Sequence, residues 1–161
     1  MKHNLKKPTF GIKTEWIPVE SLPQIPSDIK EIAIDLETKD PNLKTHGPGW
    51  ATGNGDVVGI AIAYEGYNAY LPFGHEGGGN LDRNLVLKWF KKEVGSHKAD
   101  KIFYNAAYDV GWLKRLGLEV KGRLSDAMIA APVLNEIRMS YSLNAVAYEY
   151  VGEMRSELAL R

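Results

Sequence analysis

A short apolar run that ends in two acidic residues constrains the fold of this chain more than any other feature. Residues 32–36 form a run typical of a buried central strand, and Glu37 follows it. Because side chains alternate across a strand, Asp35 and Glu37 point to one face, whereas the isoleucines point to the other. The run therefore predicts a strand that packs with one face and carries two carboxylates on the other.

The segment after this strand is rich in turn-forming residues. Residues 39–56 are rich in Gly, Pro, Asn and Thr and are predicted to form a long loop. The β-rich segments at 57–64 and 67–73 follow, separated only by Glu65 and Gly66. Two such segments with so short a connection favour an antiparallel hairpin.

Helices are expected in the second half of the chain, where apolar residues begin to recur with helical spacing after Ser and Asp residues. They are expected from Asp82 to Val94, over 106–116, from Asp126 to Leu134 and from Ser142 to Tyr150, with short strands at 101–104 and at Leu124 and Ser125. The order is three strands, helix, strand, helix, strand and two helices. This order indicates a mixed sheet flanked by helices.

Composition favours one soluble domain. The 161 residues suffice for a hydrophobic core, and the net charge of zero predicts that any contact with nucleic acid is local. No apolar run is long enough to cross a bilayer and no secretion signal follows Met1, so we expect a cytoplasmic protein without membrane partners. Four prolines and little periodicity in residues 1–30 predict a lead-in arm, and residues 31–161 are expected to form the domain.

A third carboxylate stands where a helix is expected to begin, in the segment from Asn105 to Asp109. Neighbouring carboxylates repel one another, and a hard divalent cation relieves that repulsion. Without cysteine and with few histidines, Mg²⁺ or Mn²⁺ is the expected ion. Asp35, Glu37 and Asp109 offer enough ligands for two ions about 4 Å apart, a pair that can activate water for phosphodiester cleavage. Taken alone, Asp35 and Glu37 are equally compatible with a pair of solvated surface residues.

The order of these residues resembles that of a known family. Asp35-x-Glu37 followed by Asn105-x-x-x-Asp109 resembles the first two motifs of the DEDD, or DnaQ-like, 3′–5′ exonucleases. It resembles in particular the proofreading domain of family A (Pol I-type, phage-like) DNA polymerases. Further similar segments lie at 58–61, 69–75, 79–82, 125–128 and 142–152, so the resemblance covers roughly residues 31–152.

The resemblance implies an α/β fold, a ribonuclease H-like mixed β-sheet flanked by helices. It also implies two-metal-ion hydrolysis of 3′-terminal phosphodiester bonds, which releases nucleoside 5′-monophosphates, with Mg²⁺ or Mn²⁺ as the cofactor. In such a site Asp35 would bridge both ions, Glu37 would hold the tighter ion and orient the attacking water, and Asp109 would hold the second ion.

The same resemblance implies contacts with the 3′ end of single-stranded DNA. Asn105 and Tyr108 match positions that contact the terminal nucleotide, and Thr38 is a candidate for hydrogen bonding to the 3′ end. Leu43 is a candidate for wedging between bases. For Tyr108, a packing role is as compatible with the sequence as a contact with the nucleotide. For Leu43, a packing role is favoured over wedging between bases. Asp126 matches a position that usually starts a helix and has a structural role.

The third motif of the family, Tyr-x-x-x-Asp or His-x-x-x-Asp, is missing from the sequence, and no Asp follows Asp126. The simplest explanation is a chain that ends before the last helix of the domain, with a polymerase module expected after Arg161. A natural pseudo-nuclease is the alternative. Because a missing carboxylate weakens metal binding and misplaces the water, we expect the chain alone to fold, bind metal weakly and degrade DNA feebly or not at all.

Two other functions stay open at this point. An RNase D-like 3′–5′ exoribonuclease would share the fold and the carboxylates, and only the preferred oligonucleotide would distinguish it. A non-catalytic module that docks nucleic acid or a polymerase is the other hypothesis. The three retained carboxylates argue against such a module, because clustered negative charge gains nothing when it faces phosphates.

Overall fold

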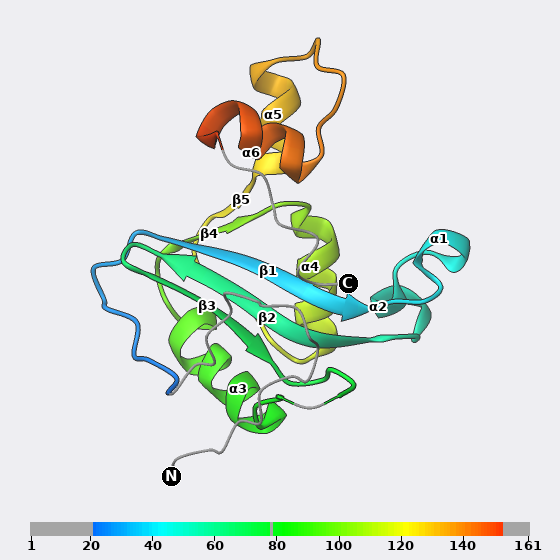
Figure 1. The fold of residues 1–161 in the computed structure, drawn as a ribbon. Coiled ribbons are helices and arrows are strands. Elements are labelled where there is room, and N and C mark those ends of the chain that lie inside the picture. Colours follow the sequence, from blue (N-terminus) through cyan, green and yellow to red (C-terminus); the bar gives the residue numbers. More distant parts are fainter. Residues whose placement is uncertain (1–20, 78, 153–161) are drawn as a thin grey trace.

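A computed structural model describes residues 21–77 and 79–152 of the chain. Its centre is a five-stranded mixed sheet in the order β3-β2-β1-β4-β5 (Figure 1). The strands are β1 (Glu31–Lys39), β2 (Asp56–Tyr64), β3 (Tyr67–Pro72), β4 (Asp100–Phe103) and β5 (Leu124–Asp126). The central strand β1 is antiparallel to β2 and parallel to β4. The predicted mixed sheet and its hairpin are therefore confirmed.

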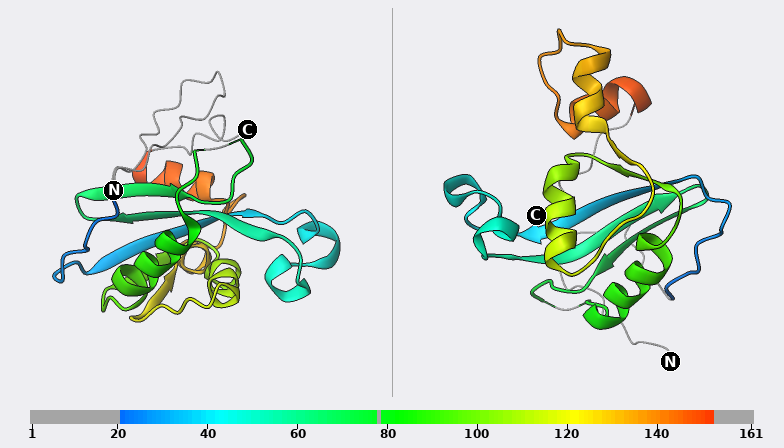
Figure 2. Two further views of the ribbon diagram at one scale, coloured as in Figure 1. Left: turned by 90° about the horizontal axis from the view of Figure 1, so that it is seen from below. Right: turned by 180° about the vertical axis from the view of Figure 1, so that it is seen from behind.

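The helices cover one face of the sheet and extend beyond one of its edges. They are α1 (Leu43–His46), α2 (Gly49–Thr52), α3 (Arg83–Trp89), the π-helix η1 (Phe90–Gly95), α4 (Ala106–Arg115), α5 (Ala127–Leu134) and α6 (Leu143–Val151). Figures 1 and 2 show α3 and α4 on the same face of the sheet, whereas α5 and α6 project beyond the edge formed by β5. Across the described residues, none of the helices has both the length and the apolar character needed to span a membrane.

The sheet buries the face opposite to the two β1 carboxylates. Ile32, Ile34 and Leu36 expose only 0%, 3% and 6% of their surface, so the predicted alternation along this strand is confirmed. They belong to one core with apolar residues of β2, α3 and α4, including Trp112. Burial of side chains of this size is worth roughly 1.5–3 kcal/mol each. The core thus fixes the position of β1 and of the carboxylates that it carries.

Three predicted helix starts are confirmed by capping hydrogen bonds. The side chains of Asp82, Asp126 and Ser142 each accept a hydrogen bond from the backbone N–H two or three residues later. The helix expected to run from Asp82 to Val94 is an α-helix only as far as Trp89, after which η1 continues it as a π-helix. Apolar spacing does not distinguish these two kinds of helix over a single turn.

The segment predicted as one long loop contains two short helices. β1 extends to Lys39, β2 begins at Asp56, and between them α1 and α2 span four residues each. The prediction of an unbroken loop is therefore wrong here. Helices of four residues are too short to give helical periodicity in a sequence. The Gly- and Pro-rich composition therefore remained the only signal, and it predicts a loop.

The predicted boundary between a lead-in arm and the domain stays a prediction, because residues 1–20 and 153–161 lie outside the described part of the chain. Ile25, which precedes that boundary, belongs to the core with 4% of its surface exposed. Trp89 Nε1 donates a hydrogen bond to the carbonyl of Pro23 at 2.6 Å. These contacts attach the segment before β1 to α3.

Candidate functional site

Asp35 and Glu37 lie next to the smallest residues of β2. In the antiparallel pairing, Asp35 faces Ala61 and Glu37 faces Gly59. The register shifts after Glu37, where an irregularity leads into Thr38. Because Ala and Gly project little or nothing from the sheet, they leave room beside the carboxylates, both of which are partly exposed.

Tyr70 of β3 reaches toward these carboxylates across β2. Burial, followed by the negative charges of Glu37 and Asp35, raises the pKa of the Tyr70 hydroxyl. That hydroxyl is hydrogen-bonded to Nε2 of His75, whose backbone N–H donates in turn to the side chain of Asn80 at 2.8 Å. Tyr70 is absent from the predicted site residues. The glycine between it and Glu37 is the signal that could have revealed it, because a strand position without a side chain often marks a close approach.

Asp109 lies in the first turn of α4 and exposes only 3% of its surface. Its carboxylate accepts a hydrogen bond from the backbone N–H of Leu36. Burial, followed by repulsion from Asp35, raises the pKa of Asp109 to about 8, and Asp126 and Glu37 add smaller contributions in the same direction. The three acidic residues predicted as metal ligands therefore lie within electrostatic reach of one another.

Asp126 holds the start of α4 in place. Its carboxylate accepts hydrogen bonds from the backbone N–H groups of Asn105 at 3.0 Å and Ala106 at 2.8 Å, and also from Met128 at 2.9 Å. Asn105 has a left-handed backbone conformation with a φ of 77°, which asparagine tolerates better than most residues. Asp126 thus has the structural role expected for it, and it sets the position from which Asp109 approaches β1.

Two predicted substrate-contacting residues, Thr38 and Tyr108, are in direct contact. Thr38 Oγ1 and Tyr108 Oη are 2.9 Å apart, and the Tyr108 hydroxyl donates to Asp40 Oδ2 at 2.9 Å. The Tyr108 ring also packs edge-on against Trp112 with 6.3 Å between ring centroids. Asp40 is absent from the predicted site residues, because no pattern distinguishes it within a segment predicted as a loop.

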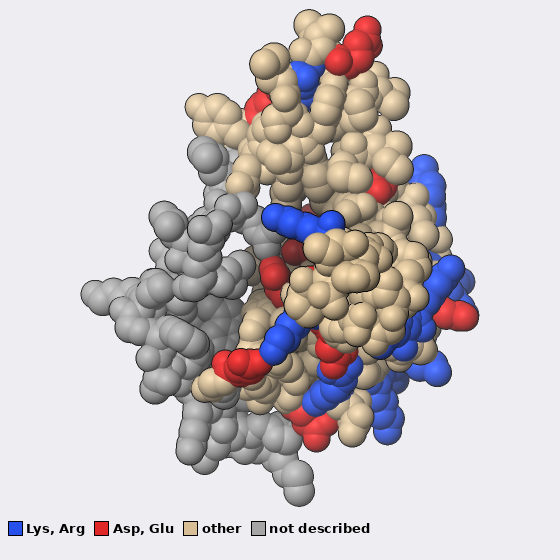
Figure 3. All heavy atoms as spheres, turned by 90° about the vertical axis from the view of Figure 1, so that its right-hand side faces the viewer, with Lys and Arg blue, Asp and Glu red and all other residues tan. Residues whose placement is uncertain are grey.

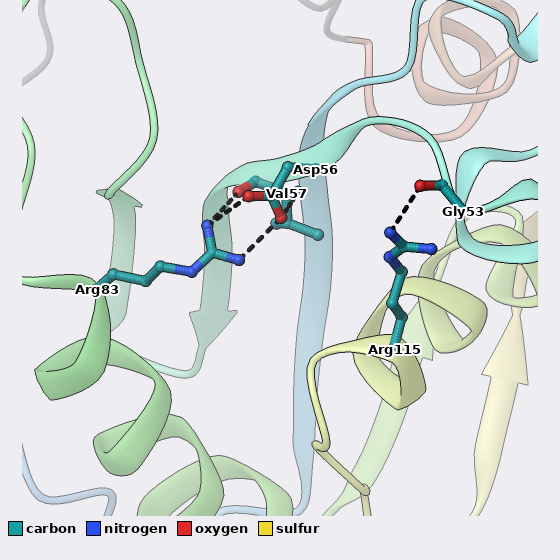
Figure 4. Close-up of polar contacts among 5 residues, drawn as sticks. All are labelled: Gly53, Asp56, Val57, Arg83 and Arg115. Atoms are coloured by element: carbon teal, nitrogen blue, oxygen red, sulfur yellow. Dashed lines mark hydrogen bonds and ion pairs between the residues drawn. The ribbon is translucent and has the colours of Figure 1, made fainter.

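The segment between β1 and β2 is anchored to two helices (Figure 4). Arg115 of α4 donates hydrogen bonds to the carbonyls of Gly49 at 3.2 Å and Gly53 at 3.0 Å. Arg83 at the start of α3 makes a two-point ion pair with Asp56, with both N–O distances at 2.8 Å. The segment that bears α1 and α2 is therefore fixed beside the helix that carries Asp109.

The other two predicted contact residues are outside this hydrogen-bonded cluster. Asn105 precedes α4, and its side chain makes no capping hydrogen bond to that helix. Leu43 lies on α1 with 40% of its surface exposed, so it does not take the core position that a packing role requires.

One recess of the surface holds acidic side chains. Figure 3 shows acidic side chains in a hollow between the α5–α6 end of the molecule and its body. Within residues 21–77 and 79–152, no group of three or more His, Asp or Glu side chains is arranged to hold a metal ion. The carboxylates near β1 provide hard oxygen donors whose mutual repulsion a cation would relieve, but they do not form a ready three-ligand site.

The sheet order, the acidic end of the central strand and the aspartate at a helix start define a ribonuclease H-like fold of the exonuclease type. The sequence matches the 3′–5′ exonuclease domain of family A DNA polymerases over residues 12–159, well over half of the chain. The chain belongs to this family. The predicted family and fold class are both confirmed.

Known relatives of the chain are polymerases. The DNA-directed DNA polymerase of Pseudomonas phage M6 is 35% identical over 164 residues, which cover 98% of this chain and 24% of the phage protein. DNA polymerase I of Synechocystis sp. is 25% identical over 159 residues, which cover 87% of this chain and 16% of that protein. The chain therefore spans less than a quarter of the length of either relative.

A solved structure shares the architecture. Brucella melitensis NrnC with bound Mg²⁺ superposes with a TM-score of 0.57 at 18% sequence identity, covering 81% of this chain and 58% of that chain. At this identity the likeness demonstrates a common fold.

Proposed function

We propose that this domain removes nucleotides from the 3′ end of single-stranded DNA, as the proofreading exonuclease of a DNA polymerase. The reaction is hydrolysis of the 3′-terminal phosphodiester bond, which releases a nucleoside 5′-monophosphate. The burial of Asp109 beside Asp35 is the observation that carries the proposal. A buried carboxylate next to another one is unfavourable unless a ligand compensates both charges, and a divalent cation does so.

Asp35, Glu37 and Asp109 would hold one or two Mg²⁺ or Mn²⁺ ions through their carboxylate oxygens. Bound ions of this kind supply an activated water and stabilise the leaving oxygen. The raised pKa of Asp109 supports the assignment, since a nearby cation would favour the ionised form that acts as a ligand.

The residues around the acidic group would bind the end of the strand. Thr38 and Tyr108 would contact the terminal nucleotide, together with Asn105 at the start of α4. Leu43, exposed on α1, would wedge between the last bases. The segment that carries α1 would then form one wall of the binding site, because it is anchored to α4 by Arg115.

A polymerase module is the proposed partner, C-terminal to this domain, because the relatives are polymerases far longer than this chain. The 161 residues contain no Tyr-x-x-x-Asp or His-x-x-x-Asp, and no Asp follows Asp126. We therefore expect this chain alone to bind cations weakly and to digest DNA feebly or not at all.

Thermal unfolding at increasing Mn²⁺ concentration tests the metal ligands. A cation that binds the folded state raises the unfolding temperature, so the wild-type chain should gain stability. Asp35→Ala and Asp109→Asn should lose most of this gain. Asp28→Asn changes an exposed carboxylate in the segment before β1 and should respond as the wild type does. Equal responses of all four proteins would rule out these two aspartates as ligands.

Digestion of 5′-labelled single-stranded oligonucleotides tests the substrate. In a version lengthened at the C-terminus to include the third motif, preference for a deoxyribo-oligonucleotide over the ribo-oligonucleotide of the same sequence is expected, and the reverse preference would favour the RNase D-like alternative. Unchanged DNA affinity and no metal response after Asp35→Ala would favour a docking module. Robust Mn²⁺-dependent digestion by the 161-residue chain would contradict the expected weak activity.

A further inference from the structure

A row of three register partners crosses the sheet from the central strand β1 to the outer strand β3. Asp35 of β1 pairs with Ala61 of β2, and Ala61 pairs in turn with Tyr70 of β3. Register partners in antiparallel strands point to the same face of the sheet. Tyr70 therefore lies on the face that carries the carboxylates, and only the small Ala61 side chain separates it from Asp35 in this row.

The Tyr70 hydroxyl lies in the next row, which contains Glu37. A Cβ added to Gly59 would be 2.1 Å from the Tyr70 hydroxyl oxygen, and Gly59 is the register partner of Glu37. Because the Cβ atoms of register partners are about 4.5–5.5 Å apart, the hydroxyl is within reach of the carboxylate at the end of the Glu37 side chain. Burial, followed by the negative charge of Glu37 and then that of Asp35, raises the pKa of Tyr70, which agrees with this placement.

The Tyr70 hydroxyl also contacts a histidine whose backbone is held in place. Tyr70 Oη is hydrogen-bonded to Nε2 of His75, and the two rings lie edge to face with 5.8 Å between their centroids. The Asn80 side chain accepts a hydrogen bond from the His75 backbone N–H at 2.8 Å and donates one to the His75 carbonyl at 2.7 Å. The next residue, Glu76, forms an ion pair with Lys39. These contacts attach the segment that carries His75 to the end of β1.

The chemistry of these three side chains favours one direction for the hydrogen bonds. An ionised carboxylate only accepts, and a hydrogen bond to a charged acceptor is stronger than one to a neutral acceptor. A neutral imidazole can donate from Nε2. We infer that Tyr70 is a positioning residue for Glu37: its hydroxyl accepts a hydrogen bond from His75 and donates one to the Glu37 carboxylate, which fixes the oxygens that would meet a divalent cation.

The inference rests on the proposed metal site and adds a residue that orients one of its ligands. Hydrogen bonds to a metal-binding carboxylate set its orientation, and loss of such a partner typically weakens metal binding by about 10–100-fold. The ring of a phenylalanine would cover Gly59 as well as that of Tyr70 does, so packing alone does not require the hydroxyl. The contribution of this hydroxyl should therefore appear in the affinity for the metal.

Mn²⁺ binding to the 161-residue chain tests the inference, because electron paramagnetic resonance of free Mn²⁺ gives the dissociation constant. Tyr70→Phe removes only the hydroxyl and should weaken binding about tenfold, at the lower end of the usual range. Tyr67→Phe is the matched control. It removes a hydroxyl at the other end of β3, where Tyr67 stacks on Tyr64, and should bind Mn²⁺ as the wild type does.

Two variants of His75 test the donor. His75→Ala should weaken Mn²⁺ binding severalfold, whereas His75→Gln keeps an N–H donor on a side chain of similar length and should retain most of the affinity. Because His75 is exposed, these variants test the same hydrogen bonds even if Tyr70→Phe fails to fold. Equal losses in both would contradict the donor role of the imidazole and overturn the inference.

The proton on the imidazole provides a readout that does not depend on metal. NMR that correlates the ring nitrogens with the ring protons identifies the tautomer of His75 in EDTA at about pH 8, where an imidazole is ordinarily neutral. The inference requires the proton on Nε2, from which it is donated to Tyr70. A proton on Nδ1 would mean that Nε2 accepts the phenol proton, so Tyr70 could not donate to Glu37 and the inference would be overturned.

The outcomes distinguish this inference from the proposed function. If Mn²⁺ binding depends on Asp35 but is equally strong in the wild type and Tyr70→Phe, the inference is overturned and the metal site stands. Absence of Mn²⁺ binding, or binding that Asp35→Ala leaves unchanged, overturns both. A loss of the same size in Tyr67→Phe would overturn the inference too, because removal of any hydroxyl from β3 would then have the same effect.

Discussion

Gly59 has no side chain at the place where the ring of Tyr70 lies: a Cβ added to Gly59 would be 2.1 Å from the Tyr70 hydroxyl oxygen. On the other side, Gly59 is the register partner of Glu37. The glycine thus allows a phenol from the outer strand β3 to approach the acidic residues of the central strand. Three strands contribute to one small area of the sheet.

Gly59→Ala should displace Tyr70 and destabilise the fold by about 1–3 kcal/mol, the usual effect of overpacking. In a Tyr70→Ala background the added methyl group meets no ring, so the loss should largely disappear. Urea unfolding of the wild type, both single variants and the double variant gives the coupling energy. Additive losses would show that the two residues are not in contact in solution.

The stability of the metal-free protein should fall as the pH rises through the neutral range. Burial and Asp35 raise the pKa of Asp109 from 3.8 to about 8, so between these values the folded state holds a proton that the unfolded chain has lost. The free energy of unfolding therefore decreases with increasing pH. Asp109→Asn should flatten this decrease and stabilise the metal-free protein near pH 8 by at least about 2 kcal/mol, since one pKa unit is worth about 1.4 kcal/mol.

Urea unfolding in EDTA at about pH 6 and about pH 8 measures this effect. Asp28→Asn, the exposed control, should keep the wild-type slope. Mn²⁺ should reduce the slope of the wild type, because a cation favours the ionised carboxylate. If the free energy of unfolding of Asp109→Asn fell with pH as steeply as that of the wild type, the pH dependence would have to come from another group.

Gly111→Ala should weaken the contact between α2 and α4. An Ala in place of Gly inside a helix normally stabilises it by about 1 kcal/mol. Here the added Cβ would be 2.4 Å from the Trp50 indole ring, so we expect destabilisation. The same change in a Trp50→Ala background should be stabilising, as in an ordinary helix. Thermal unfolding of the wild type, Gly111→Ala, Trp50→Ala and the double variant checks this change from destabilisation to stabilisation. If Gly111→Ala stabilised the protein in both backgrounds, Gly111 and Trp50 would not be in contact.

Asp126→Ala should be among the most damaging substitutions outside the core. It removes the acceptor of three backbone N–H groups at the starts of α4 and α5, and we expect a loss of about 2–4 kcal/mol. Asp82→Ala is the matched control, because it removes one capping bond and should cost about 1 kcal/mol. Urea unfolding compares the two. Equal losses would mean that the bonds to α4 contribute nothing.

The elements that could be predicted are those whose signal is local. The apolar run of β1 predicts a buried strand without any knowledge of the segments that pack against it. The capping residues Asp82, Asp126 and Ser142 accept hydrogen bonds from N–H groups only two or three residues away. The helix α2 could not be predicted, since hydrogen bonds from the distant Arg115 hold it in place, and α1 spans only four residues.

The candidate site likewise contains residues that could be predicted from the sequence and residues that could not. Asp35, Glu37 and Asp109 could be selected because three carboxylates in an ordered pattern favour cation chemistry and because their order resembles the motifs of a known family. Asp40 and Tyr70 could not, because their involvement depends on strand register and on contacts between separate segments. Asp40 meets Tyr108 across 68 positions of sequence, and no local pattern reports such a pair.

We expect the segment that bears α1 and α2 to be exchangeable as one unit. Residues 41–55 form no strand of the sheet, and the arginines that hold this segment and its end at Asp56 belong to α4 and α3. Surface connections tolerate changes in length far better than strands do. An engineer could therefore graft the corresponding stretch of another polymerase at this position and leave the acidic residues of β1 undisturbed.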